Sequence, residues 1–367
     1  MRRLAGCLAL WALVAAPAAG AVRFAVIGDY GRAGAGELAV SQLVKSFQPD
    51  LVITTGDNNY PNGCADTIDA NIGQYYHEYI YNYAGGYGEG SAALRFLPSL
   101  GNHDYGCSPQ PYLDYFTLPG NERYYDHQVG NVHFFAVDSN PQGGGTSTTS
   151  EQALWLKAGL AASTATWKIV YFHHPPYSSG AHGSTTYMRW PFKSWGATAV
   201  IAGHDHTYER LHVEALPFFV NGLGGNTRYN FVSVLPQSYM RFNANFGAMI
   251  VEAHANVLRF EFWDVNRNLV DAYARFGLAP PINLSADRVT SSGLRLVWGD
   301  TSAAEKGFRI ELSTDGTNFV KRADTARDAD RAVVSGLSPK TTYYLRVRAF
   351  GQAGVSSPSN TVKVMTL

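Results

Sequence analysis

The stretch Leu51-Val52-Ile53-Thr54-Thr55-Gly56-Asp57-Asn58-Asn59-Tyr60 decides the fold. Its first half is an apolar, β-branched run, which predicts a buried parallel strand. Its second half is a polar loop, so we expect Asp57 and Tyr60 to lie at the carboxyl end of that strand. Open α/β sheets bind ligands at this edge. The stretch therefore predicts an α/β domain whose functional site forms where its strands end.

Four other segments end in the same way, as an apolar run that breaks into a short polar loop. Each loop motif alone is weak, because an isolated Gly-Asp pair or histidine is usually a turn or a structural group. Together they are hard to explain by folding, since carboxylates and imidazoles are costly to bury unpaired. The four loops are Asp29-Tyr30-Gly31, Gly101-Asn102-His103-Asp104, His173-His174-Pro175 and Gly203-His204-Asp205-His206.

The rest of the pattern predicts how the chain is divided. Strands alternate with helices in the first part, including an amphipathic helix over residues 67–83 and a helix that begins at a capping box formed by Thr148 and Glu151. Consecutive strands follow over residues 216–276. We therefore expect an α/β sandwich with an added antiparallel sheet, forming one catalytic domain over residues 22–278.

A second, all-β domain is predicted over residues 279–367. It follows a linker, Leu278-Ala279-Pro280-Pro281, and consists of short alternating strands separated by turn residues. It resembles a fibronectin type III domain over nearly its whole length. Trp298 stands where that family has its core tryptophan, and the segment 337–343 resembles its tyrosine corner. Structure explains these residues without a catalytic role.

The amino-terminal residues 1–21 are typical of a secretory signal peptide. Arg2 and Arg3 precede an apolar run that is too short to span a membrane comfortably, and Ala19-Gly20-Ala21 offers small residues for cleavage. We therefore expect an exported protein, secreted or periplasmic. The formal net charge of zero argues against binding of nucleic acid.

Removal of the signal peptide leaves two cysteines, Cys64 and Cys107. Each lies a few residues beyond a candidate site loop, and an even number of cysteines in an oxidising compartment favours a disulfide. Such a bridge would stabilise the fold by about 4 kcal/mol. The alternative is two free or buried thiols.

The residue types in the five loops suit a pair of metal ions. A carboxylate has two oxygens, so Asp57 is able to bridge ions that lie about 3.5–4 Å apart. Phenolate and carboxylate oxygens favour a hard trivalent ion, whereas imidazoles and the amide of Asn102 suit a borderline divalent ion. We therefore expect an asymmetric pair of metals.

As a set, these motifs resemble the purple acid phosphatase branch of the calcineurin-like metallophosphoesterases, over roughly residues 24–276. The resemblance implies a metallophosphoesterase β-sandwich flanked by helices, followed here by the small immunoglobulin-like domain. Plant-type members instead carry their sandwich first, so selectivity that they owe to that module is not carried over. The resemblance implies Fe(III) held by Asp29, Asp57, Tyr60 and His206, and a divalent Fe, Zn or Mn held by Asp57, Asn102, His173 and His204.

The resemblance also implies the reaction, which is hydrolysis of phosphomonoesters by attack of a metal-bound hydroxide. In this family, histidines in the positions of His103 and His182 bind phosphate and protonate the leaving group. His174 competes for that role, but neighbours at a strand end usually point apart. The other histidines belong to no motif and are expected to be structural or surface groups: His77, His127, His133, His212 and His254.

Charge supports a phosphate ester as substrate. Three anionic ligands, Asp29, Asp57 and Tyr60, against ions of +3 and +2 leave a centre of net charge +2, or +1 with a bridging hydroxide, which attracts a phosphomonoester dianion. The nearest alternative is a phosphodiesterase or nucleotide hydrolase on the same metal pair. An alternative of another class is a non-catalytic adhesion protein that binds carbohydrate or protein surfaces through the C-terminal sandwich.

Overall fold

The computed structural model of the protein describes residues 21–143, 145–302, 304–351 and 354–367. The predicted signal peptide lies, except for Ala21, outside these residues. Within them, no helix is both long enough and apolar enough to cross a membrane. The chain forms two compact units, of which the second comprises Ala253–Arg259 and Tyr273–Leu367. The domain limits at 278 and 279 stay a prediction.

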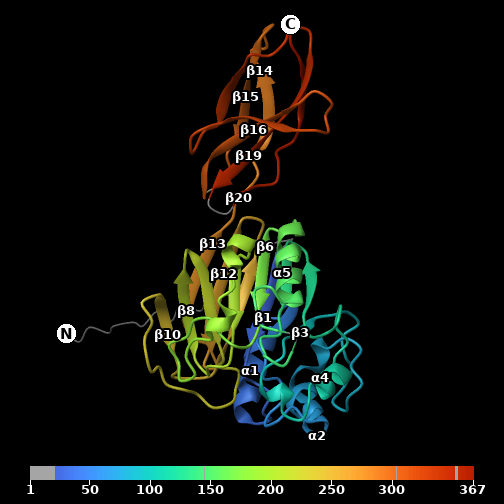
Figure 1. The fold of residues 1–367 in the computed structure, drawn as a ribbon, viewed down its shortest axis with the longest axis vertical. Coiled ribbons are helices and arrows are strands. Elements are labelled where there is room, and N and C mark those ends of the chain that lie inside the picture. The colour runs from blue at the N-terminus through green and yellow to red at the C-terminus, as the bar shows by residue number, and fades with distance from the viewer. Residues whose placement is uncertain (1–20, 144, 303, 352–353) are drawn as a thin grey trace, which may run out of the picture. The chain divides into compact units, whose positions relative to one another are not determined.

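The first unit is built on a 6-stranded and a 7-stranded sheet (Figure 1). The first sheet has, in spatial order, β13 (Leu269–Phe276), β12 (Val257–Asp264), β11 (Gly247–Ala253), β1 (Val22–Ile27), β2 (Leu51–Thr54) and β3 (Phe96–Pro98). Strands β1, β2 and β3 are parallel, and Ile53 of β2 is paired with Val26 and Leu97. Strand β2 is completely buried, as its β-branched sequence predicts.

The second sheet is mixed. Its order is β10 (Ser238–Phe242), β8 (Tyr208–Val213), β9 (Leu216–Asn221), β7 (Ala199–Ala202), β6 (Trp167–Tyr171), β5 (Val132–Ala136) and β4 (Tyr125–Val129). Strands β5, β6, β7 and β9 are parallel to one another, whereas β4 on one side and β8 and β10 on the other are joined by antiparallel pairing. The strands after residue 216 therefore extend both sheets, whereas the sequence suggested that they form an added sheet of their own.

Aromatic side chains join the two sheets into a sandwich. Phe24 of β1 meets Phe134 of β5 edge to face at 4.9 Å, and Phe219 of β9 stacks on Phe260 of β12 at 4.7 Å between ring centroids. Phe135, which follows Phe134 in β5, faces the opposite side of the second sheet. There it joins the buried cluster that contains Leu156 of helix α5 (Glu151–Ala162). Because successive side chains of a strand point to opposite faces, one face of the second sheet packs on the first sheet and the other face packs on helix α5. Figure 1 shows α5 alongside β6.

Two helices differ from the prediction. Helix α5 begins after Ser150, whose hydroxyl accepts a hydrogen bond from the Ala153 amide, so the capping residue is Ser150 and not Thr148. The helix expected over residues 67–83 is broken into short turns. Hydroxyl groups of Tyr83 and Tyr115 both donate to Asp69 at 2.7 Å, at the start of its π-helical turn. These segments are α2 (Ala65–Ile68), η1 (Asp69–Gly73), α3 (Gln74–Tyr76) and η2 (His77–Tyr79).

The described residues contain five further helical segments. Helix α1 connects β1 to β2, as a parallel pair requires. The five are α1 (Ala35–Ser46), η3 (His103–Tyr105), α4 (Gln110–Tyr115), η4 (Thr186–Met188) and α6 (Phe192–Trp195).

The second unit contains the predicted β-sandwich. Trp298 is buried in its core against Phe308, with ring centroids 5.5 Å apart, and the Tyr343 hydroxyl accepts a hydrogen bond from the Ser338 amide at 3.0 Å. The second contact is the predicted tyrosine corner. One sheet has β14 (Ile282–Asp287), β15 (Gly293–Gly299) and β18 (Arg331–Ser335); the other has β17 (Val320–Asp324), β16 (Glu305–Ser313), β19 (Thr342–Gly351), β20 (Gly354–Val355) and β21 (Val362–Met365).

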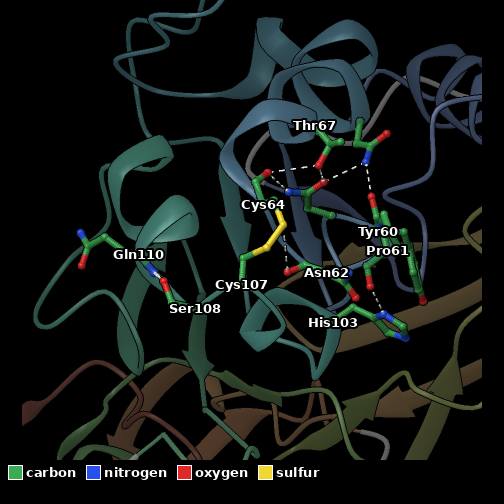
Figure 2. Close-up of a disulfide and its surroundings, with 11 residues drawn as sticks. Tyr60, Pro61, Asn62, Cys64, Thr67, His103, Cys107, Ser108 and Gln110 are labelled. Atoms are coloured by element: carbon green, nitrogen blue, oxygen red, sulfur yellow. Dashed lines mark hydrogen bonds between the residues drawn. A yellow bond between two sulfur atoms is a disulfide. The ribbon is translucent and has the colours of Figure 1, made fainter.

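The predicted disulfide between Cys64 and Cys107 is confirmed, with Cα atoms 5.3 Å apart (Figure 2). Beside it, the Cys107 amide donates to the carbonyl of Asn62 at 2.6 Å. The bridge thus joins the loop that follows Tyr60 to the loop that follows His103. Two segments that carry candidate site residues are therefore covalently tied.

Candidate metal centre

The predicted ligands lie at the carboxyl ends of strands from both sheets. Four follow strands β1, β2 and β3 of the first sheet, and three follow β6 and β7 of the second. The structure brings all seven to one place, as the contacts below show. They are Asp29, Asp57, Tyr60, Asn102, His173, His204 and His206.

The backbone at this place is held in unusual conformations. Asp29, Asp57 and His204 all adopt left-handed geometry, with φ of 54°, 53° and 70°. Non-glycine residues rarely adopt this geometry, and such strain is concentrated at functional sites. A Cβ atom on Gly101 would lie 2.1 Å from the Asp57 amide nitrogen, so only glycine permits this approach between the two loops.

One half of the site contains Asp29, Tyr60 and His206. The Tyr60 hydroxyl lies 2.8 Å from Asp57 Oδ2, 3.2 Å from His206 Nε2 and 3.5 Å from Asp29 Oδ1. His206 Nε2 lies 3.3 Å from the same Asp29 oxygen. All four side chains are buried. Asp29, Asp57 and His206 offer ligand atoms within 4.8 Å of one another, which is the arrangement of a metal-binding group.

The other half contains Asn102, His173 and His204. His173 Nε2 lies 2.9 Å from Asn102 Oδ1, 3.1 Å from His204 Nδ1 and 3.4 Å from Asp57 Oδ1. The two Asp57 oxygens thus face different halves, Oδ2 toward Tyr60 and Oδ1 toward His173. This is the position that a bridging carboxylate needs.

Backbone carbonyls fix the orientation of two imidazoles. His173 Nδ1 donates to the Thr55 carbonyl at 2.8 Å, and His206 Nδ1 donates to the Thr227 carbonyl at 2.8 Å. Each ring therefore presents the lone pair of Nε2 to the centre. This pattern, in which the second nitrogen is tied to a carbonyl, is usual for metal-binding histidines.

Electrostatics distinguish the anionic groups before a metal binds. Burial alone would raise the pKa of Asp57, but the imidazoles of His173 and His103 outweigh it, so the pKa lies below its ordinary value. Burial, together with the charges of Asp57 and Asp29, raises the pKa of Tyr60 well above its ordinary value. Asp57 is therefore a carboxylate at neutral pH, whereas Tyr60 keeps its proton until a cation replaces it.

These side chains fit a pair of cations. Within the described ranges, the basic groups within ion-pair distance of Asp29 and Asp57 are all imidazoles, with no lysine or arginine among them. Buried carboxylates without such a partner are costly, unless a metal ion supplies the positive charge. The donor set of carboxylate, phenol, amide and imidazole groups matches metals that accept both oxygen and nitrogen ligands.

Both predicted catalytic histidines lie beside this centre. The ring of His182 stacks on that of His204, with centroids 4.2 Å apart. His103 Nδ1 donates to the Pro61 carbonyl at 2.5 Å (Figure 2), and its Nε2 lies 3.9 Å from Asp57 Oδ2. They thus flank the centre from two different loops.

His174 also lies at the centre, contrary to the expectation that it points away from His173. Its ring centroid lies 4.6 Å from that of His204, and it forms a group of candidate ligands with His173 and His204. Its Nδ1 contacts the Ser139 hydroxyl at 2.9 Å. Burial, aided by His173, lowers the pKa of His174 to about 3, so the ring is neutral. Among the histidines outside every motif, His133 contacts Asp126 and Ser163 instead.

Two carboxylates that the sequence reasoning left without a role position the site loops. Asp104 accepts hydrogen bonds from the amides of Asn58, Asn59 and Gly101 at 2.8–3.2 Å, and so joins the loops after β2 and β3. Burial and the charge of Asp57 raise the pKa of Asp104 to about 7. Asp205 accepts from the His182 amide at 2.8 Å. Their only sequence signal is their place inside the Gly-Asn-His-Asp and Gly-His-Asp-His motifs.

Comparison with known proteins agrees with this geometry. Purple acid phosphatase 17 of Arabidopsis thaliana is 29% identical over 239 residues, covering 56% of this chain and 69% of that protein. Tartrate-resistant acid phosphatase type 5 of Mus musculus is 24% identical over 266 residues, covering 60% and 79%.

Structural comparison finds the same fold in a purple acid phosphatase from yellow lupin seeds. The TM-score is 0.59 at 18% identity, covering 69% of this chain and 53% of that one. The family model for fibronectin type III domains matches residues 279–365, and that for calcineurin-like phosphoesterases matches residues 22–208, which is more than half of the chain. The chain therefore belongs to the calcineurin-like phosphoesterase family, and it carries a C-terminal fibronectin type III domain.

Proposed function

We propose that this phosphoester hydrolase is an exported phosphatase that cleaves phosphomonoesters at a dinuclear metal centre. Family membership makes it a hydrolase of phosphoric esters. The observation that carries the finer proposal is the position of Asp57, whose two oxygens face the two halves of the ligand set. Export is supported by the Cys64–Cys107 disulfide, because such bridges persist in oxidising compartments.

The ligand set supports an unequal pair of metals. Asp29, Asp57, Tyr60 and His206 would hold Fe(III), because phenolate and carboxylate oxygens are hard anions. Asp57, Asn102, His173 and His204 would hold a divalent Fe, Zn or Mn. When bound, such a pair supplies positive charge that makes water acidic and stabilises charge developing on the phosphoryl oxygens.

The protein's own groups account for binding and protonation. His103 contacts the Tyr60 ring and His182 contacts the His204 ring, one in each half of the ligand set, and we infer that they hold the phosphoryl oxygens and give a proton to the leaving alcohol. Asp205 fixes the backbone of His182, and the Pro61 carbonyl fixes the His103 ring. His174 is less suited to donate a proton, because its ring is buried and bound to Ser139.

Substrate class is tested by comparing 4-nitrophenyl phosphate with bis(4-nitrophenyl) phosphate. A monoester dianion carries one more negative charge than a diester, and the cationic centre favours it. We expect kcat/KM to be on the order of 100-fold higher for the monoester, and a chelator to abolish both activities. A preference for the diester would support the phosphodiesterase alternative. A metal-loaded protein that cleaves neither ester would support the non-catalytic adhesion alternative.

The iron assignment is tested by Tyr60→Phe. We expect the visible absorbance of the iron-loaded protein to disappear, because the phenolate that gives charge transfer to Fe(III) is lost. Tyr229→Phe is the matched control, since the Tyr229 ring stacks on His206 at 4.1 Å without belonging to the ligand set. An unchanged colour in Tyr60→Phe would show that the iron assignment is wrong.

The role of the histidines is tested by leaving-group dependence. In His182→Asn and His103→Asn, we expect kcat for an alkyl phosphate to fall on the order of 100-fold, because its alcohol leaves only when protonated. The loss for 4-nitrophenyl phosphate should be much smaller, since that leaving group needs little protonation. His127→Asn, on edge strand β4, is the control. Equal losses on both esters would contradict proton donation and leave a role in phosphate binding alone.

A further inference from the structure

The fibronectin type III domain contains a cluster of three carboxylates far apart in sequence. Asp300 follows strand β15, Glu305 is the first residue of β16, and Asp328 lies between β17 and β18. One oxygen from each lies within 4.8 Å of the other two. Three negative charges at this separation repel one another unless a positive charge lies between them.

Glu305 is the member that the fold itself leaves uncompensated. Its side chain is fully buried, yet neither carboxylate oxygen accepts a hydrogen bond from any residue that the structure describes. Buried carboxylates are normally paired or hydrogen-bonded, because desolvation of the charge costs several kcal/mol or more. A buried, unpartnered carboxylate that points into an acidic cluster indicates a binding site for a cation.

Arg327 is the one nearby basic group recorded among the described residues, and it does not fill this role. Its Nε lies 3.7 Å from Glu305 Oε1 and 3.7 Å from Asp328 Oδ1, beyond hydrogen-bond distance to either. Its side chain is 63% exposed. Three carboxylates and one guanidinium give a net charge of −2, which one divalent cation would neutralise.

We propose that Asp300, Glu305 and Asp328 form a Ca²⁺ site in the fibronectin type III domain. Ca²⁺ prefers oxygen ligands at about 2.3–2.6 Å, so two oxygens on one ion lie at most about 5 Å apart, which the cluster satisfies. The Ser302 hydroxyl offers a neutral oxygen nearby, since it is buried without a hydrogen-bond partner and the Ser302 amide donates to Asp300 at 2.9 Å. Water would complete the shell. The ion would tie the β15–β16 turn to the β17–β18 loop, independently of the phosphatase centre.

The site is tested by calorimetric titration of the EGTA-treated, full-length protein with Ca²⁺. To separate it from the dinuclear centre, the titration uses Asp57→Asn as background. We expect one Ca²⁺ per chain, with a Kd of about 10⁻⁴–10⁻³ M, as in extracellular modules. Adding Asp328→Asn should weaken Ca²⁺ binding at least tenfold. Asparagine is chosen because it tolerates the left-handed φ of 57° at this position. Asp330→Asn, which removes an exposed carboxylate paired with Arg331, is the control.

A second variant distinguishes a cation site from a structural pair between Glu305 and Arg327. Without Ca²⁺, Glu305→Gln should raise the Tm of the domain, because it removes an uncompensated buried charge, and Ca²⁺ should then no longer raise the Tm. A lower Tm in EGTA would show that Arg327 already balances Glu305 and would overturn the proposal. The proposal would also be overturned if no Ca²⁺ bound at a Ca²⁺ concentration 10-fold above the expected Kd, or if Asp328→Asn left Ca²⁺ binding unchanged.

Discussion

The first unit depends on one constraint: polar side-chain atoms approach one another closely where the carboxyl ends of strands from both sheets meet. The Tyr60 hydroxyl lies 2.8 Å from one oxygen of Asp57, and the imidazole nitrogens of His173 and His204 lie 3.1 Å apart. Such groups attract one another only through protons or cations placed between them. Because Tyr60, Asp57 and His173 are buried, solvent does little to relieve the repulsion. The proposed pair of metal ions would turn this arrangement from a cost into a stabilising interaction.

The surrounding structure holds these groups together by several independent means. The Cys64–Cys107 disulfide and the Asp104 carboxylate both join the loop after β2 to the loop after β3. Strands β1 to β3 belong to one sheet and β6 and β7 to the other, so the sandwich core also fixes the two halves of the site relative to each other. Left-handed geometry at Asp29, Asp57 and His204 is tolerated because these supports determine it.

The sequence predicted that these seven side chains would meet, because each follows a buried apolar strand and parallel strands bring their carboxyl ends to one edge. It did not predict details that depend on tertiary contacts. The segment 67–83 is broken into short turns, and Asp69 in its π-helical turn accepts hydrogen bonds from Tyr83 and from Tyr115, which lies outside the segment. The inward position of His174 and the role of Asp104 likewise follow from loop conformations without a periodic signal. The carboxylates of the proposed Ca²⁺ site are separated by turns and strands, so no motif marks them.

The most direct test is anomalous X-ray scattering from crystals of the metal-loaded protein, recorded on both sides of the iron absorption edge. We expect two metal peaks about 3.5–4 Å apart, with Asp57 between them. The peak that contacts Tyr60 should be iron, and the other should contact His173. An absence of metal among these side chains, or a single ion that Asp57 does not contact, would contradict it.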